Sequence, residues 1–113
     1  MNESTNNRNE QGERAFREGE ELLEHERFEE ALRAFERALE LCSEDAEAWN
    51  NKGVALWHIG RNEEALNAYN RALDIDGEDA VAWYNKSTVL KALGRDHEAK
   101  KALDRHDELI FEK

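Results

Sequence analysis

Acidic, histidine and cysteine side chains are the first candidates for chemistry in this sequence. Asp74, Asp76 and Gly77 resemble the start of a calcium loop, but an EF-hand needs its glycine at the sixth position, and here the glycine comes fourth. The four histidines form no pair four residues apart, and none stands at zinc-ligand spacing from Cys42. Phosphate-binding and nucleophile-elbow motifs are absent from the sequence. The sequence therefore predicts no enzyme, no metal site and no cofactor.

Amide and aromatic side chains offer a second kind of chemistry, the recognition of another protein. Asn51 and Asn85 stand 34 residues apart. An amide both donates and accepts hydrogen bonds, so a row of asparagines can bind a peptide backbone whatever its side chains are. Two ordinary exposed asparagines inherited with a repeat would show the same spacing. Trp57 and Tyr84 would add an aromatic recognition surface, or would pack between neighbouring repeats.

The elements that must position these side chains recur with a period of 34 residues. The last two copies align without a gap, so that Trp49 falls on Trp83 and Gly60 on Gly94. Such a period is typical of a stacked-repeat protein, which presents an extended surface rather than an enclosed pocket. We expect a disordered polar tail over residues 1–11 and one domain over 12–113, with repeats at 12–45, 46–79 and 80–113.

Each copy carries two apolar stripes with helical spacing. In the second copy Trp49, Gly53, Leu56 and Gly60 are four, three and four residues apart, and a second stripe begins at Ala65. The pattern predicts two helices of about 14 residues per copy, and thus an all-α fold of six helices in three antiparallel hairpins. Gly53 and Ala65 are small, so we expect the two backbones to approach closely there.

These residues resemble the tetratricopeptide repeat, whose pattern is W-x2-L-G-x2-Y, then alanine, an aromatic residue, alanine and proline. The resemblance covers residues 12–113. The second copy carries the pattern at Trp49, Gly53, Leu56, Ala65, Tyr69 and Ala72. The resemblance implies a right-handed superhelical solenoid that acts as a protein-binding adaptor, with the first helix of each repeat lining a concave groove.

The groove that this resemblance implies identifies candidate partner-binding residues. An extended peptide or a partner's helix would lie along them. They are Phe16, Asn50, Asn51, Val54, Trp57, His58, Tyr84, Asn85, Thr88 and Lys91.

Some relatives capture the acidic C-terminal tail of heat-shock chaperones with a clamp of lysine, arginine and asparagine side chains. The corresponding positions here are Phe16, Glu20, Asn51, Val81 and Asn85. Only Asn51 matches, and Glu20 would repel an acidic tail. The sequence therefore predicts that the chain is not a chaperone carboxylate clamp.

The departures from the family pattern lie at turns and at the end of the array. Glu26 replaces the turn glycine of the first copy, so we expect its hairpin to be the loosest. Lys100, His106 and Asp107 stand at positions that would contact a following repeat. Because terminal repeats need a polar outer face, we interpret residues 96–113 as a capping helix.

Charge and composition restrict the class of partner. The net charge of −11 disfavours nucleic acid and mildly favours a cationic partner, although acidic helix faces also serve solubility alone. The sequence has no apolar run long enough to span a membrane, and its single cysteine fits a reducing cytoplasm. An alternative to the adaptor is a self-associating scaffold. Residues 1–45 carry 14 acidic and 6 basic residues, whereas residues 80–113 carry 6 and 7, so the chain would be a monomer or a weak homodimer formed by head-to-tail or edge contact.

Overall fold

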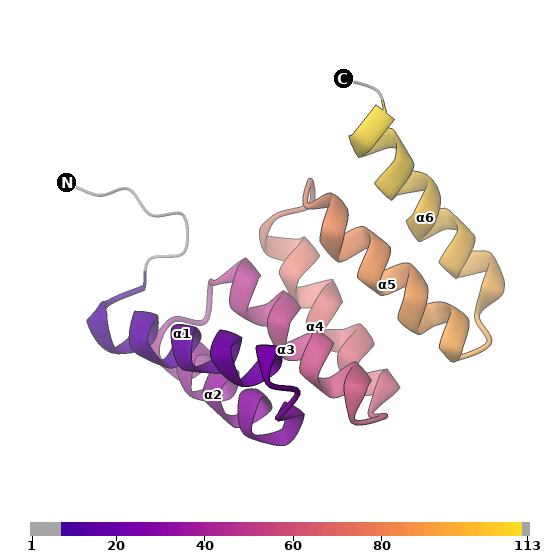
Figure 1. The fold of residues 1–113 in the computed structure, drawn as a ribbon. Coiled ribbons are helices and arrows are strands. Elements are labelled where there is room, and N and C mark those ends of the chain that lie inside the picture. Colours follow the sequence, from indigo (N-terminus) through magenta and orange to yellow (C-terminus); the bar gives the residue numbers. More distant parts are fainter. Residues whose placement is uncertain (1–7, 112–113) are drawn as a thin grey trace.

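The computed structural model describes residues 8–111 and folds them into six α-helices. Each consecutive pair forms an antiparallel hairpin, and the three hairpins stack side by side (Figure 1). First helices contact first helices, and the second helix of each hairpin packs on the first helix of the next. This arrangement confirms the predicted all-α solenoid. The helices are α1 (Glu10–Glu24), α2 (Phe28–Leu41), α3 (Ala46–His58), α4 (Asn62–Ile75), α5 (Ala80–Ala92) and α6 (Asp96–Phe111).

Side-chain caps determine where the first helix of each hairpin begins. Asn9, Asp45 and Asp79 are the N-caps of α1, α3 and α5, and each side chain accepts a hydrogen bond from a backbone N–H in the first turn. Asp45 and Asp79 are one period apart, whereas Asn9 lies two residues earlier than the period requires. The structure thus starts α1 at Glu10.

The prediction of a disordered tail is wrong for residues 8–11. Glu10 and Gln11 belong to α1, because Asn9 supplies the helix cap that the apolar period does not reveal. Arg8 is fixed by ion pairs to Asp45 at 2.5 Å and to Glu13 at 2.9 Å. The rest of the predicted tail, residues 1–7, lies outside the described residues.

A residue with positive φ ends the first helix of every hairpin. Gly60 and Gly94 have φ values of 86° and 78°, and Glu26 adopts 59° at the same position. In each turn, the backbone N–H of the residue that follows donates a hydrogen bond to a backbone carbonyl of the preceding helix. Arg27 N donates to Leu22 O in this way at 2.9 Å. The first turn therefore follows the same path as the others, and its glutamate bears the energetic cost of a left-handed conformation.

We expect Glu26→Gly to raise the free energy of unfolding by about 0.5–1 kcal/mol, because glycine adopts positive φ without steric conflict. The matched control is Gly60→Ala, which should lower it by about 1 kcal/mol. A β-carbon at Gly60 has no neighbour within 4 Å, so that substitution tests the backbone conformation alone. Urea unfolding of both variants measures the effects, and a destabilised Glu26→Gly would contradict this account of the turn.

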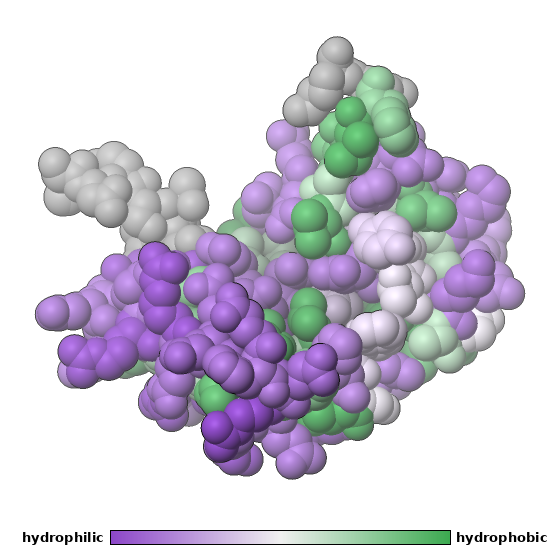
Figure 2. All heavy atoms as spheres, in the orientation of Figure 1, coloured by the Kyte–Doolittle hydropathy of each residue, from purple (hydrophilic) through white to green (hydrophobic). Residues whose placement is uncertain are grey.

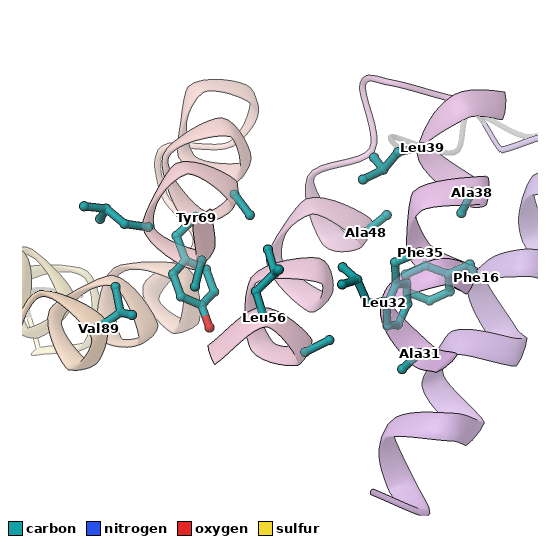
Figure 3. Close-up of a cluster of buried hydrophobic side chains, with 14 of the residues drawn as sticks. Phe16, Ala31, Leu32, Phe35, Ala38, Leu39, Ala48, Leu56, Tyr69 and Val89 are labelled. Carbon is teal, nitrogen blue, oxygen red and sulfur yellow. The ribbon is translucent and has the colours of Figure 1, made fainter. Parts of the chain in front are cut away.

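Alanines, leucines and aromatic rings fill the interior of the first two hairpins. Ala31 and Ala65 are fully buried, and the rings of Phe35 and Tyr69 lie in the buried cluster shown in Figure 3. A β-carbon added at Gly53 would lie 2.5 Å from the Tyr69 ring. The missing side chain at Gly53 therefore makes room for an aromatic ring on α4.

Candidate functional site

The predicted groove residues fall into three groups in the structure. The first is buried or lies at a junction between hairpins. Phe16 is only 2% exposed and meets Phe35 edge to face with ring centroids 5.7 Å apart. The Arg8 guanidinium covers its ring, 3.6 Å from the centroid. The prediction that Phe16 lines a groove is therefore wrong, because the segment before α1 and the α2 side chains enclose it.

His58 and Asn50 also lie at junctions between hairpins. The His58 ring stacks on Phe28 of α2, with centroids 4.1 Å apart and planes 4° from parallel. Asn50 is 9% exposed, and its Oδ1 accepts a hydrogen bond from Asn85 Nδ2 at 3.3 Å. Asn85 therefore pairs with Asn50. It does not form, with Asn51, a row of asparagines that are both available to a peptide backbone.

The second group lies on the inner surface, where α1, α3 and α5 lie side by side. Asn51 is half-buried there, and Val54 is half-buried and packs against the core. Acidic side chains dominate the α1 and α3 part of this surface. Burial and the neighbouring carboxylate of Glu47 raise the pKa of Glu20 above its usual value.

Arg8 neutralises part of this acidic surface. It pairs with Glu13 and Glu47 at 2.9 Å, and its side chain is 10% exposed. Burial opposes the charge of Arg8, but hydrogen bonds to Asp45, Glu13 and Glu47 raise its pKa above the ordinary value. The hydrogen bond from Arg8 holds the pKa of Glu13 below its usual range, against a smaller opposing effect of burial.

The third group surrounds a hollow of about 670 Å³ at the end of the array. Four predicted residues, Trp57, Tyr84, Thr88 and Lys91, line it together. Figure 2 shows a mostly hydrophilic surface over α1 and α2, with apolar and weakly polar atoms over α5 and α6. The remaining lining residues are Ser87, Ala92, Asp96, Ala99, Lys100 and Leu103.

This hollow corresponds to surfaces that are covered elsewhere in the array. The residues one period before Tyr84 and Lys100 are Asn50 and Leu66, which are 9% and 5% exposed because α5 packs over them. Tyr84 is 51% exposed, and the His106 ring lies beside it, with centroids 5.5 Å apart. The α5–α6 hollow is therefore the surface on which a further first helix would pack.

Sequence reasoning missed the α6 side of the hollow as a site. The sequence indicates Lys100 only as a position that would contact a following repeat, and it indicates no role in binding for Leu103. The available signal was a difference between two positions one period apart, because Tyr69 of the second copy is replaced by the smaller Leu103 in the third. Arg8 was missed because a single arginine in a polar segment has no periodic pattern.

Two features that would indicate other functions are absent from the described residues. Between residues 8 and 111, no group of three or more His, Cys, Asp or Glu side chains is placed to hold a metal ion. Within the same range, none of the helices combines the length and the apolar character that crossing a membrane requires.

Comparison with known proteins identifies the family. A tetratricopeptide repeat model matches residues 16–80, and a second tetratricopeptide repeat model matches residues 80–109. The chain belongs to the tetratricopeptide repeat family, whose domains mediate protein–protein interaction. No curated protein matches the sequence significantly.

Solved structures share the fold. The second tetratricopeptide domain of Spaghetti (RPAP3), bound to the HSP90 peptide SRMEEVD, is 23% identical with a TM-score of 0.86, covering 88% of this chain and 93% of that one. The TPR2B domain of yeast Sti1 in complex with an Hsp70 peptide is 25% identical with a TM-score of 0.87, covering 89% and 81%. YrrB, described as having an unusual peptide-binding site, is 28% identical with a TM-score of 0.83, covering 89% and 52%.

Proposed function

We propose that this chain is a protein-binding adaptor that holds a helix or peptide segment of a partner in the α5–α6 hollow. One observation carries the proposal: the equivalent surfaces of the first two hairpins are each covered by a helix, and this one is open. The relatives bound to peptides support the class of activity. The single cysteine, Cys42, favours a reducing compartment such as the cytoplasm.

The lining of the hollow indicates the chemistry of the bound segment. Tyr84 and Leu103 are 51% and 40% exposed, so an apolar side chain would fill the centre. Lys91 and Lys100 lie at the hollow with Asp96, which favours an acidic residue beside that apolar anchor. A cationic partner would instead bind the acidic surface over the first hairpin.

A pair of α5 variants tests the proposed site. Tyr84→Ala removes an aromatic ring from the hollow, and Val81→Ala is the matched control, because Val81 is 60% exposed on the same helix and does not line the hollow. Affinity capture from the source cell should lose its specific partner with Tyr84→Ala and keep it with Val81→Ala. Loss with Val81→Ala alone would place binding on the inner surface, and unchanged capture with both would reject the hollow as the site.

We also propose that the adaptor does not act as a chaperone carboxylate clamp. Two residues at positions that correspond to the clamp support this proposal. Phe16 lies buried beneath Arg8, and the carboxylate of Glu20 lies near that of Glu47. A peptide carboxylate at these positions would meet the negative charge of Glu20 and Glu47.

Titration with the peptide SRMEEVD tests this second proposal. We expect no saturable binding in the low-micromolar range at physiological salt, measured by calorimetry. The second tetratricopeptide domain of Spaghetti, which is seen with this peptide, serves as the positive control. Low-micromolar binding that is lost on Asn51→Ala would show that the clamp proposal is wrong.

A further inference from the structure

An apolar register recurs where one hairpin meets the next. α2 and α3 run antiparallel and are joined by residues 42–45, so residues equally distant from that connection lie opposite each other. Leu39 is therefore opposite Ala48, and Leu32 is opposite Ala55. All four are at most 7% exposed, and Figure 3 shows the two leucines on the side of α2 that faces α3.

The junction between α4 and α5 repeats this register one period later. Leu73 is opposite Ala82, and Leu66 is opposite Val89. Ala82 and Val89 are fully buried, and Leu66 is 5% exposed. Two independent junctions thus use leucines on the second helix and small or branched residues on the next first helix.

The two ends of the array carry charges at these same positions. On α6, the leucine positions are occupied by Lys100 and Asp107. On α1, the positions that face the preceding hairpin are occupied by Arg14 and Glu21. All four side chains are exposed. In the register of the internal junctions, Glu21 would lie opposite Lys100 and Arg14 opposite Asp107, so each position meets the opposite charge.

A third pair of positions, which are in contact where internal hairpins meet, also carries complementary side chains at the two ends of the array. In the second junction, Asn85 of α5 contacts Asn50 of α3. The equivalent residues at the ends are Arg17 of α1 and Tyr84 of α5. Arg17 is 70% exposed and Tyr84 is 51% exposed, so the guanidinium can stack on the ring as Arg8 does on Phe16.

One contact in this register is unfavourable. His58 stacks on Phe28 at the first junction, and the equivalent residues at the ends are Glu24 and Asp96. Two carboxylates would meet at the rim, which makes the contact weaker than the internal junctions.

We propose that the hollow is occupied by α1 of a second copy of this chain, stacked in the register of the internal junctions. The inference rests on the proposed function, since it names the partner of the same hollow. Each copy offers its α1 face and its α5–α6 hollow at opposite ends, so the contact is head to tail and continues beyond two copies.

Sedimentation of the purified full chain tests this inference. From about 10 µM to about 1 mM protein at low salt, the average mass should rise with concentration past that of a dimer. Raising the salt to about 1 M should return the chain toward monomer, because the pairs at the contact are exposed and are screened. A monomer over the whole concentration range would overturn the inference.

Charge reversal tests the register itself. Lys100→Glu and Glu21→Lys should each weaken association by roughly tenfold, since each turns an attraction into a repulsion. The double variant should restore it, because both reversed ends occur on every copy. Lys101→Glu is the matched control, because Lys101 is exposed on α6 and does not line this hollow. Asp96→Asn should strengthen association.

The outcomes separate this inference from the proposed function. A monomeric chain whose Tyr84→Ala variant still loses a cellular partner would keep the proposed function and reject self-stacking. The head-to-tail register would also be rejected if neither charge reversal weakened association, or if association stopped at a dimer. Association restored by the double charge reversal would support it.

Discussion

Gly53→Ser is expected to lower the free energy of unfolding by about 3 kcal/mol, at the upper end of the cost of overpacking. The added β-carbon would lie 2.5 Å from the Tyr69 ring, a separation that real β-carbons do not show. The ring is 2% exposed and belongs to the buried core, so it has little room to move. Urea unfolding followed by far-UV circular dichroism measures the change.

The third hairpin shows how the clash can be relieved. Ser87 stands one period after Gly53, and Leu103 stands one period after Tyr69. We therefore expect Tyr69→Leu to cost less in the Gly53→Ser background than alone, with a coupling energy of at least about 1 kcal/mol. Additive effects would show that the ring does not set the cost.

A control separates crowding from the general effect of adding a side chain. Gly77→Ala adds a β-carbon whose nearest neighbour is a backbone oxygen of Leu73 at 3.4 Å, an ordinary contact. It should change the free energy of unfolding by no more than about 0.5 kcal/mol. A loss at Gly77 as large as that at Gly53 would contradict the packing explanation.

Arg8→Ala is expected to lower the free energy of unfolding by about 2–3 kcal/mol. Asp45 is 0% exposed and receives hydrogen bonds from Arg8 and from Ala48 N, so removing the guanidinium takes a charged partner from a buried carboxylate. The stacking on Phe16 would also be lost. The matched control is Arg33→Ala, an exposed arginine on α2, which should change stability by less than about 0.5 kcal/mol.

The cost of Arg8→Ala should depend on pH in a defined direction. The pKa of Glu13 is lowered by its hydrogen bond to Arg8, so that pair stabilises the fold at pH values above the unfolded pKa of about 4.3. Its contribution is lost as the pH falls through the lower folded pKa. The difference in unfolding free energy between wild type and Arg8→Ala should therefore be larger at pH 7 than near pH 3, and a constant difference would contradict the Arg8–Glu13 contribution.

Most of the fold could be predicted because its causes are local or periodic. The stripes that include Leu56 and Ala65 predict helices, and Gly60 marks a helix end whatever surrounds it. Arg8 could not be predicted, because its partner Asp45 is 37 residues away and no short-range pattern connects them. Of the candidate residues, Trp57, Tyr84, Thr88 and Lys91 line the hollow together, whereas Phe16 is buried.

The repeat, the helices and their order could be predicted because they follow from residue spacing and from residues that start or end helices. Which exposed-face residues remain accessible depends instead on how the helices pack together. Asn50 and Tyr84 have equivalent positions in their repeats. Asn50 is covered because α5 packs beside it. Tyr84 is exposed because, between residues 8 and 111, no further hairpin packs its first helix against α5. Exposure depends on what stacks against a position, and that is a property of the assembled array rather than of the repeat.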